Sequence, residues 1–379
     1  MTKRYYLLLL SLLCFIHQPK AETGLPSDSL PRFLTENKVL HFLTGHKYLT
    51  APFVFYMPET NWVLGIGVKR FFHAGGVEDT LTRASNSSVF VQYSLNQQLM
   101  LEHNYQIFTN KERYYIMGYY GFSRFPVNYY GTGENASLAN KEAINYDLLR
   151  FENLTMRKVK PFTFVGLGWR YFKMYNIRGE EGGIMEQEKI TGYDGSTVSG
   201  LSAAILYDSR DNVLTTSKGS FLELSYTNHL KEFGSTHNFQ RWIIDLRKFY
   251  KPFKTREDVV ALQTYAQFSN GNIPFSELGL LGGDMIMRGY YQGSFRDNNL
   301  FAMQAEYRWQ VLKRWGIAGF GGVGSVKKQL ADFDIQTLKP SYGAGLRFKI
   351  NRKENVNVRV DYGFGNGQQN LYFFIAEAF

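Results

Sequence analysis

One arginine lies in a glycine-rich stretch between two segments of alternating hydrophobicity. The stretch reads Leu280-Leu281-Gly282-Gly283-Asp284-Met285-Ile286-Met287-Arg288-Gly289-Tyr290-Tyr291. A guanidinium is a planar fork that can hold a carboxylate through two hydrogen bonds while it stacks on an aromatic ring. Glycine at position 289 permits backbone conformations that a side chain forbids. These residue types indicate a structural anchor for a long loop, although a surface loop whose Arg288 faces solvent is the alternative.

No catalytic or metal-binding pattern stands out elsewhere. The histidines beyond residue 21 show no His-Glu-x-x-His spacing: His41, His46, His73, His103, His229 and His237. No serine or aspartate can be paired with a positioned histidine base, as a lipase or protease would need. The glycine clusters at 321–324 and 363–367 open no helix, so they do not fit a nucleotide-binding loop. The sequence therefore predicts no enzyme activity, no cofactor and no metal.

The amino-terminal segment predicts export. Two basic residues precede an apolar run from Tyr5 to Ile16, and residues 18–21 form a plausible cleavage site, so we expect a signal peptide over residues 1–21. The apolar run is shorter than the roughly 20 residues of a spanning helix, which argues against a helical membrane protein. The single cysteine, Cys14, lies inside this run, so the exported chain would have no disulfide.

Composition fits a chain that exposes aromatic surface without any long apolar segment. Aromatic residues make up 16%, with 26 tyrosines and 36 glycines, yet the sequence is 44% hydrophobic with a mean hydropathy of -0.29. Alternation of lipid-facing and lumen-facing residues reconciles these values. The formal charge is +10, and removing Lys3, Arg4 and Lys20 of the expected signal peptide leaves +7. This charge fits phosphorylated lipid headgroups, an anionic passenger, or simply solvated basic loops.

Apolar residues then recur at every second position. The stretches 88–95, 99–108, 241–247 and 356–362 each place apolar residues on one face and polar or charged residues on the other. A soluble sandwich would alternate in the same way. Export, the count of about sixteen such segments and the aromatic residue Phe379 favour a bacterial barrel. We therefore predict an all-β, transmembrane antiparallel barrel of about sixteen strands in the outer membrane.

The chain divides into a short leader and one large domain. We expect a periplasmic lead-in over residues 22–50, helix-compatible from Phe33 to Leu49, and the barrel over residues 51–379. Long links should face the outside and short ones the periplasm. The long links are Tyr129–Lys141, Asn176–Ser199 and Gly271–Asn298, and the short ones are Asn110–Glu112, Lys158–Lys160 and Arg352–Glu354. A link as long as residues 271–298 more often has a function or is mobile than serves only as a connection.

The arginine stretch resembles a motif of a known family. Residues Met287, Arg288, Gly289 and Tyr290 are similar to the Val-Arg-Gly-Phe/Tyr motif of the BamA/TamA superfamily, the bacterial surface antigen family of sixteen-stranded outer-membrane barrels. Further matches follow in the same order: Tyr56–Thr60, Tyr207–Asn212 with Lys218-Gly219, Glu306–Arg308, Phe320–Gly324, Gly343–Phe348 and Arg359–Gly363. Each pattern is weak alone, but together they cover most of the chain.

The resemblance implies that the arginine loop is inserted from the extracellular side into the lumen. Glu306 matches a family acid, and Phe320 matches the aromatic residue of a Phe-x-Asp-x-Gly strand. The aspartate and final glycine of that pattern correspond to Gly322 and Gly324, so one expected partner of Arg288 is missing. Glu306, or in second place Asp361, should then carry the pairing.

The resemblance also implies a function in, or accessory to, outer-membrane protein assembly or translocation. Family members that insert or secrete proteins usually carry periplasmic POTRA modules, and residues 22–50 are too few for one. The resemblance further implies a seam between the first and last strands that can open to pass strands into the lipid. Prolines bounding Pro52–Met57 would weaken that seam, but they also fit an ordinary strand start. We expect the last strand, Asn370–Phe379, to carry an insertion signal at Phe373, Ile375 and Phe379.

The alternative function is a passive channel or a lipid-binding barrel without insertase activity. The expected partners are outer-membrane lipid, including lipopolysaccharide, and other assembly or secretion subunits. Nucleic acid is not an expected partner, because export takes the chain out of the cytoplasm. Aromatic pairs such as Tyr119-Tyr120 fit interfacial girdles better than stacking platforms for a ligand.

Overall fold

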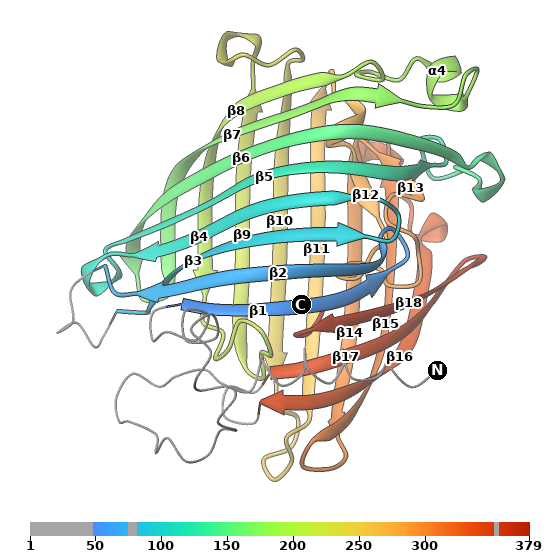
Figure 1. The fold of residues 1–379 in the computed structure, drawn as a ribbon. Helices are drawn as coiled ribbons and strands as arrows, with labels where there is room; N and C mark the ends of the chain where they lie inside the picture. Colours follow the sequence, from blue (N-terminus) through green and yellow to red (C-terminus); the bar gives the residue numbers. More distant parts are fainter. Residues whose placement is uncertain (1–47, 75–81, 352–355) are drawn as a thin grey trace, which may run out of the picture.

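The chain forms a closed antiparallel β-barrel (Figure 1). A computed structural model describes residues 48–74, 82–351 and 356–379. Within these residues sixteen strands close the barrel, and two short strands form a separate hairpin. This confirms the predicted all-β barrel, whereas the expected signal peptide and residues 22–47 lie outside the described residues. The first strand begins at Tyr48, so Tyr48 and Leu49 are in a strand and not in a helical lead-in.

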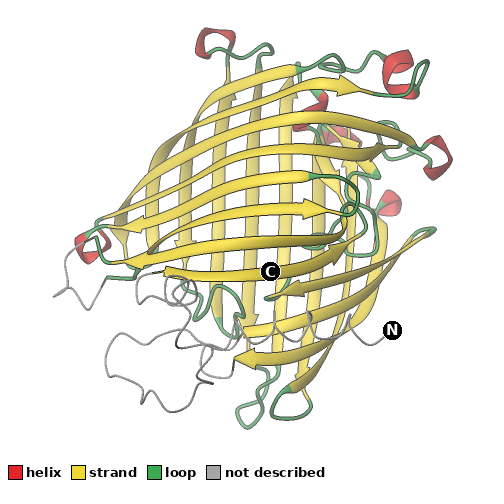
Figure 2. Ribbon diagram, viewed as in Figure 1, coloured by secondary structure: helices red, strands yellow, loops and turns green. Residues whose placement is uncertain are grey.

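Strands dominate the described chain, with a few short helical turns at its rims (Figure 2). The barrel strands are β1 (Tyr48–Met57), β2 (Asn61–Phe72), β3 (Ser85–Ser94), β4 (Leu99–Phe108), β5 (Tyr114–Tyr129), β6 (Glu142–Lys160), β7 (Thr163–Arg178), β8 (Ser196–Asp208), β9 (Gly219–His229), β10 (Phe239–Tyr250), β11 (Val259–Gly271), β14 (Asn299–Gln310), β15 (Trp315–Lys327), β16 (Lys339–Asn351), β17 (Val356–Gly365) and β18 (Gln368–Ile375). The hairpin is β12 (Gly279–Leu281) with β13 (Phe295–Asp297). The helical pieces are α4 (Ile184–Glu188) and the 3-10 turns η2 (Asn110–Glu112), η3 (Leu138–Asn140), η4 (Lys231–Phe233), η5 (Phe275–Glu277), η6 (Leu330–Asp332) and η7 (Ile335–Thr337). None of the helices in the described ranges is long and apolar enough to cross a membrane.

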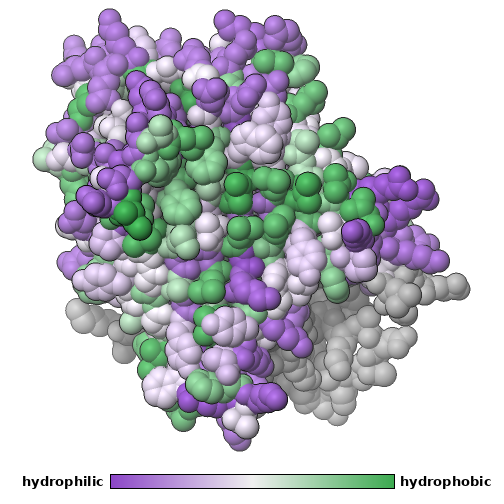
Figure 3. All heavy atoms as spheres, turned by 180° about the vertical axis from the view of Figure 1, so that it is seen from behind, coloured by the Kyte–Doolittle hydropathy of each residue, from purple (hydrophilic) through white to green (hydrophobic). Residues whose placement is uncertain are grey.

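The alternation of each strand separates an apolar outer face from a polar inner face. In β14, Met303 and Tyr307 are exposed, whereas Glu306 and Arg308 between and beside them are buried. Charged residues point inward in this way and apolar residues point outward, which is the reverse of a soluble sandwich. Figure 3 shows apolar side chains gathered across the middle of one side of the barrel, with hydrophilic ones above them.

The long links gather at one end of the barrel, which we call the long-loop end. They are 130–141, 179–195 and 272–298, each close to its predicted range but shortened by strand residues. The predicted short link Lys158–Lys160 is wrong: these residues finish β6, and the turn is Pro161-Phe162. The cause is that the basic residues continue the ladder with β7 through Lys158 and Lys160. The predicted link Arg352–Glu354 lies outside the described residues.

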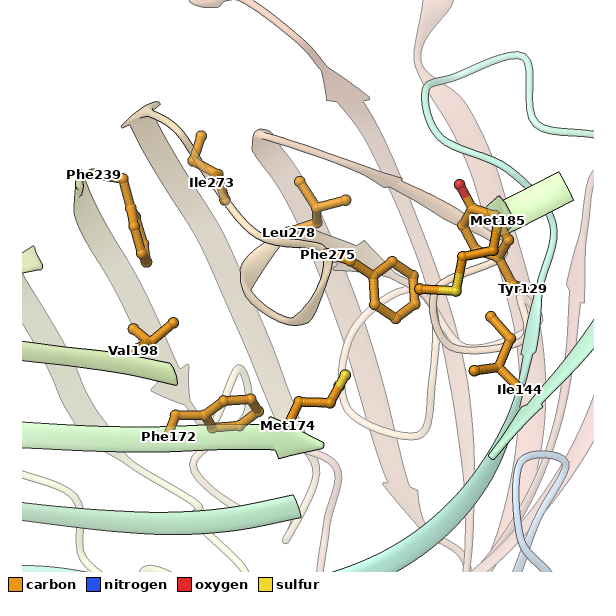
Figure 4. Close-up of a cluster of buried hydrophobic side chains, with 10 residues drawn as sticks. All are labelled: Tyr129, Ile144, Phe172, Met174, Met185, Val198, Phe239, Ile273, Phe275 and Leu278. Atoms are coloured by element: carbon orange, nitrogen blue, oxygen red, sulfur yellow. The ribbon is translucent and has the colours of Figure 1, made fainter. Parts of the chain in front are cut away.

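An apolar cluster closes part of the long-loop end (Figure 4). Met185 of α4 and Phe275 of η5 turn toward inward-facing side chains of the neighbouring strands, among them Tyr129, Ile144 and Met174. All of them are buried. The links 179–195 and 272–298 both contribute apolar side chains to this shared core, which stabilises them against the wall.

The barrel closes where β1 meets β18, and this junction is its weakest. Within the described residues one register pair joins these strands, Tyr56 with Phe373. By comparison, ten pairs join β1 to β2 and eight join β17 to β18. Pro52 is the fifth residue of β1 and not its start, so the missing N–H falls inside this edge strand. Of the two interpretations that the sequence left open, the structure favours a weakly paired seam.

Candidate functional site: the arginine loop and its interior cluster

The arginine loop, residues 282–294, connects β12 to β13 and packs on inward-facing residues of the wall. One buried apolar cluster joins the loop and its hairpin to the wall strands β14 and β15: Leu281, Met287, Tyr290, Phe295, Leu300, Ala302 and Val326. The side chain of Gln304 accepts a hydrogen bond from the Met287 N–H (3.2 Å) and donates one to the Met285 carbonyl (2.7 Å). These two hydrogen bonds hold the loop backbone to β14 independently of the Arg288 side chain.

Two glycines let the loop backbone lie directly on β17. Gly289 has a φ of 116°, and a Cβ built there would stand 2.5 Å from the carbonyl carbon of Phe364. On the facing strand, a Cβ at Gly363 would stand 2.8 Å from the carbonyl carbon of Arg288. Side chains at either position would push the loop away from the wall. Gly363 of the 363–367 cluster thus serves a close backbone approach.

Arg288 divides its guanidinium between two carboxylates. Its Nη2 lies 2.5 Å from Glu306 Oε2, and its Nη1 lies 2.5 Å from Asp361 Oδ2. The guanidinium carbon stands 3.6 Å from the centre of the Phe320 ring, in stacking range. The structure therefore brings together Arg288 with Glu306, Phe320 and Asp361, and Asp361 is a full partner, not a substitute for Glu306. Burial alone would lower the pKa of Arg288, but these two carboxylates raise it above its ordinary value, so the guanidinium stays charged.

Further charges extend this pair into an interior cluster that sequence reasoning missed. Arg308 bonds Glu306 at 2.6 Å, Arg359 bonds Asp361 at 2.7 Å and Asp284 at 3.0 Å, and Arg347 bonds Asp361 and, at 2.8 Å, Glu377. Among the described members, four guanidiniums meet four carboxylates, so the charges balance. Equal numbers of positive and negative groups matter here because a buried charge without a partner is unfavourable. Removing one partner of a buried ion pair typically destabilises a protein by about 3–5 kcal/mol. The spacing of Glu306 with Arg308 and of Arg359 with Asp361 is the signal that could have found them, since residues two apart on a strand share a face.

The remaining predicted site residues lie around this cluster. The Tyr290 hydroxyl donates to the Pro340 carbonyl at 2.7 Å. At Gly324 a Cβ would stand 2.9 Å from Leu281 Cδ1, so this glycine makes room for the loop stem. A Cβ at Gly322 would meet Met303 and Gln304, and the structure does not bring this residue to Arg288. Within the described ranges, no group of His, Cys, Asp and Glu side chains could hold a metal ion.

The predicted last strand, Asn370–Phe379, is wrong at its end. β18 finishes at Ile375, and Ala376 takes a φ of 80°, which turns the chain out of the ladder. Residues 376–379, the inward tail, then enter the barrel: Phe379 is buried beside Phe249, and its carbonyl accepts a hydrogen bond from Arg308 Nη2 at 3.0 Å. Phe373 lies in the seam near Trp62 (6.1 Å between ring centres), and Ile375 ends β18. Of the three residues predicted to carry an insertion signal on the last strand, Phe379 lies outside the strand and points inward.

The buried position of Phe379 gives a testable expectation. Phe379→Leu keeps an apolar side chain but loses the ring, so we expect the free energy of unfolding to fall by about 1 kcal/mol. The midpoint of the heat-induced mobility shift on gels measures this change. Phe233→Leu is the control, because Phe233 is 42% exposed on η4 and its replacement should leave the midpoint unchanged. Equal midpoints for both variants would contradict the inward placement.

Comparison with known proteins supports the fold. The Omp85 superfamily domain matches residues 55–379. The chain is similar to the crystal structure of BamA from Haemophilus ducreyi lacking POTRA domains 1-3, with 13% identity and a TM-score of 0.60 over 87% of this chain and 70% of that one. It is also similar to CdiB from Acinetobacter baumannii (13% identity, TM-score 0.56, 87% and 59% of the two chains) and to CdiB from Escherichia coli (12%, 0.58, 86% and 62%). No curated protein sequence matches the chain.

These structural likenesses are too distant in sequence to carry more than the fold. The chain spans less than two thirds of either CdiB chain. The domain match, however, extends over most of the sequence and coincides with the barrel from β1 to the inward tail. The chain therefore belongs to the Omp85 superfamily, and its fold is that of the outer-membrane barrels which the resemblance to the BamA/TamA group indicated.

Proposed function

We propose that this barrel acts in, or as an accessory to, outer-membrane protein assembly or translocation, through a seam between β1 and β18 that opens. The observation that carries the proposal is the single register pair at this junction, Tyr56 with Phe373. An edge strand with unpaired N–H and C=O groups is a template for another strand. A client strand could add to such an edge without first breaking a long ladder.

The arginine loop supplies the rigid counterpart in this proposal. Arg288 ties the loop to Glu306 on β14 and to Asp361 on β17, so the wall next to the seam stays fixed while the seam itself parts. We propose that the loop occupies the lumen as the family resemblance implies, with Met287 to Tyr290 as its docking motif. The work of the cluster is structural, and the proposed function needs no catalytic residue or cofactor.

The outward surface and the proposed function indicate two kinds of partner. We propose that the outward apolar band contacts outer-membrane lipid, with lipopolysaccharide on its outer side. Assembly or secretion subunits are the protein partners that the proposal requires. Photo-crosslinking from the seam residues, followed by identification of the captured proteins, would name them.

A disulfide across the seam tests the proposed function. Tyr56→Cys with Phe373→Cys, in a chain whose Cys14 is serine, places two thiols at the paired positions. Oxidation should abolish insertion of a client barrel into vesicles that contain the purified protein, and reduction should restore it. Tyr48→Cys with Arg70→Cys is the control, because it bridges the fully paired β1 and β2 and should leave insertion intact. A passive channel would insert no client whether or not either bridge is formed. Full insertion with the seam locked would refute the proposal.

A further inference from the structure

The apex of the arginine loop, residues 289–292, touches both edges of the seam. On the β18 side, the Gly289 N–H donates to the Tyr372 hydroxyl (3.1 Å), and the Gly289 carbonyl accepts from Asn370 Nδ2 (2.8 Å). The Tyr291 N–H donates to Gln368 Oε1 at 2.9 Å. These β18 residues are two apart, so they share the inner face of the last strand. The apex thus follows β18 along its length.

On the other side of the seam the apex reaches the first hairpin. The Gln292 N–H donates to Glu59 Oε1 at 2.5 Å, and Glu59, in the turn between β1 and β2, is only 2% exposed. The Glu59 carbonyl in turn accepts hydrogen bonds from Asn96 Nδ2 (3.3 Å) and Gln98 Nε2 (3.0 Å). The turn is therefore fixed to the β3–β4 link, and Glu59 is its contact with the loop.

We propose that the loop apex is an internal strap that holds the seam closed, and that Glu59 positions the β1 edge on this strap. Its biological meaning rests on the proposed function, because a strap matters only if the seam opens. The strap replaces backbone ladder bonds, which are nearly absent between the described β1 and β18, with hydrogen bonds through a third segment. The Tyr372 hydroxyl also donates to the Tyr290 carbonyl (3.2 Å), so four hydrogen bonds hold the β18 side and one holds the β1 side. Opening should therefore begin at Glu59.

The surroundings of Glu59 make this contact sensitive to pH. Its Oε2 is buried without a hydrogen-bond partner. Burial, helped by the nearby charge of Asp284 and opposed by the Gln292 N–H, raises the pKa of Glu59 from 4.5 to about 7. Tyr291 of the loop, Tyr130 of the β5–β6 link and Tyr372 of β18 also face it.

The direction of the pH effect follows from the raised pKa. In an open seam Glu59 would be solvated and would titrate near 4.5, whereas in the closed seam it titrates near 7. The closed form therefore binds the proton more tightly, and its advantage is complete below pH 4.5. As the pH rises from 4.5 to about 7 this advantage is lost, and above 7 the balance becomes flat.

Distance measurements between spin labels on either side of the seam test the strap. Labels on Leu64→Cys in β2 and Leu371→Cys in β18, both outward facing and exposed, report seam width in the full-length barrel in nanodiscs, with Cys14 replaced by serine. Below pH 4.5, where Glu59 is neutral, Glu59→Ala should increase the open population on the order of tenfold, as expected for losing one hydrogen bond. Glu59→Gln keeps an acceptor and should stay mostly closed, but without the rise in opening between pH 4.5 and 7.

Two further variants test the electrostatic and the β18 contributions to the strap. Asp284→Asn removes the nearby charge and should move the pH response to lower pH without abolishing it. Should Glu59→Ala fail to fold, Gln368→Ala with Asn370→Ala removes two of the four hydrogen bonds on the β18 side and should also widen the seam. An unchanged distance distribution in folded variants at every pH would overturn the proposal. Because this readout needs no client, a moving seam whose locked form still inserts proteins would sink the proposed function and leave the strap standing.

Discussion

Arg288→Ala is expected to destabilise the barrel by about 3–5 kcal/mol, the cost of breaking a buried ion pair from one side. The substitution leaves Glu306 and Asp361 facing Arg308, Arg347 and Arg359, and the cluster loses the charge that lies between the two acids. It also removes the cation from the Phe320 ring. The midpoint of heat-induced unfolding on gels should fall, and the arginine loop should become open to limited proteolysis.

Two further substitutions make this result specific. Arg288→Lys retains the charge but not the fork that reaches two carboxylates at once, so it should recover only part of the lost stability. Arg124→Ala is the matched control: its side chain is 64% exposed and pairs with Asp147 at 2.8 Å. Such exposed pairs contribute about 0–1 kcal/mol. If Arg288→Ala and Arg124→Ala shifted the midpoint equally, the cluster would not be the anchor described above.

Gly289→Ala should detach the arginine loop without removing any charged group. The added Cβ would lie 2.5 Å from the backbone of Phe364, which cannot move aside because it belongs to β17. A side chain at positive φ costs about 1 kcal/mol, and overpacking adds about 1–3 more. We expect a fall in unfolding free energy of up to about 4 kcal/mol and loop proteolysis resembling that of Arg288→Ala.

A second glycine separates the effect of φ from the effect of contact. Gly234 has a φ of 91°, close to that of Gly289, but a Cβ there would meet nothing within 4 Å. Gly234→Ala should therefore show the conformational cost alone. Similar losses for both variants would mean that the close approach of the loop to β17 contributes nothing, and the docking geometry would have to be abandoned.

The sequence was sufficient for the architecture because alternation is a local signal. Each strand shows its two faces within a few residues, and the arginine motif supplied Arg288, Glu306, Phe320 and Asp361 as one group. Arg347 and Glu377 could not be found in this way. They reach the cluster through strand register and through the turn at Ala376, and neither is visible in a single sequence without knowing which residues lie opposite one another.

The seam is a second feature that sequence could not settle. Pro52 was compatible with a strand start or with a weakened edge, and its place inside β1 depends on pairing that begins at Tyr48. The strap has the same origin, because Glu59 and Gln292 are separated by 233 positions and meet only after the barrel closes. Long-range closure fixes such contacts, and local propensity does not.

The interior cluster has a consequence for the order in which the molecule matures. Its members run from Asp284 to Glu377, so the first eleven barrel strands, β1 to β11, contribute no charge to it within the described chain. A growing or partly inserted chain can pair those early strands while its later arginines still lack their acids. Every charge of the cluster can be paired only after Asp361 of β17 and Glu377 of the inward tail have joined Arg288 and Arg347, which places full neutralisation at the end of barrel closure.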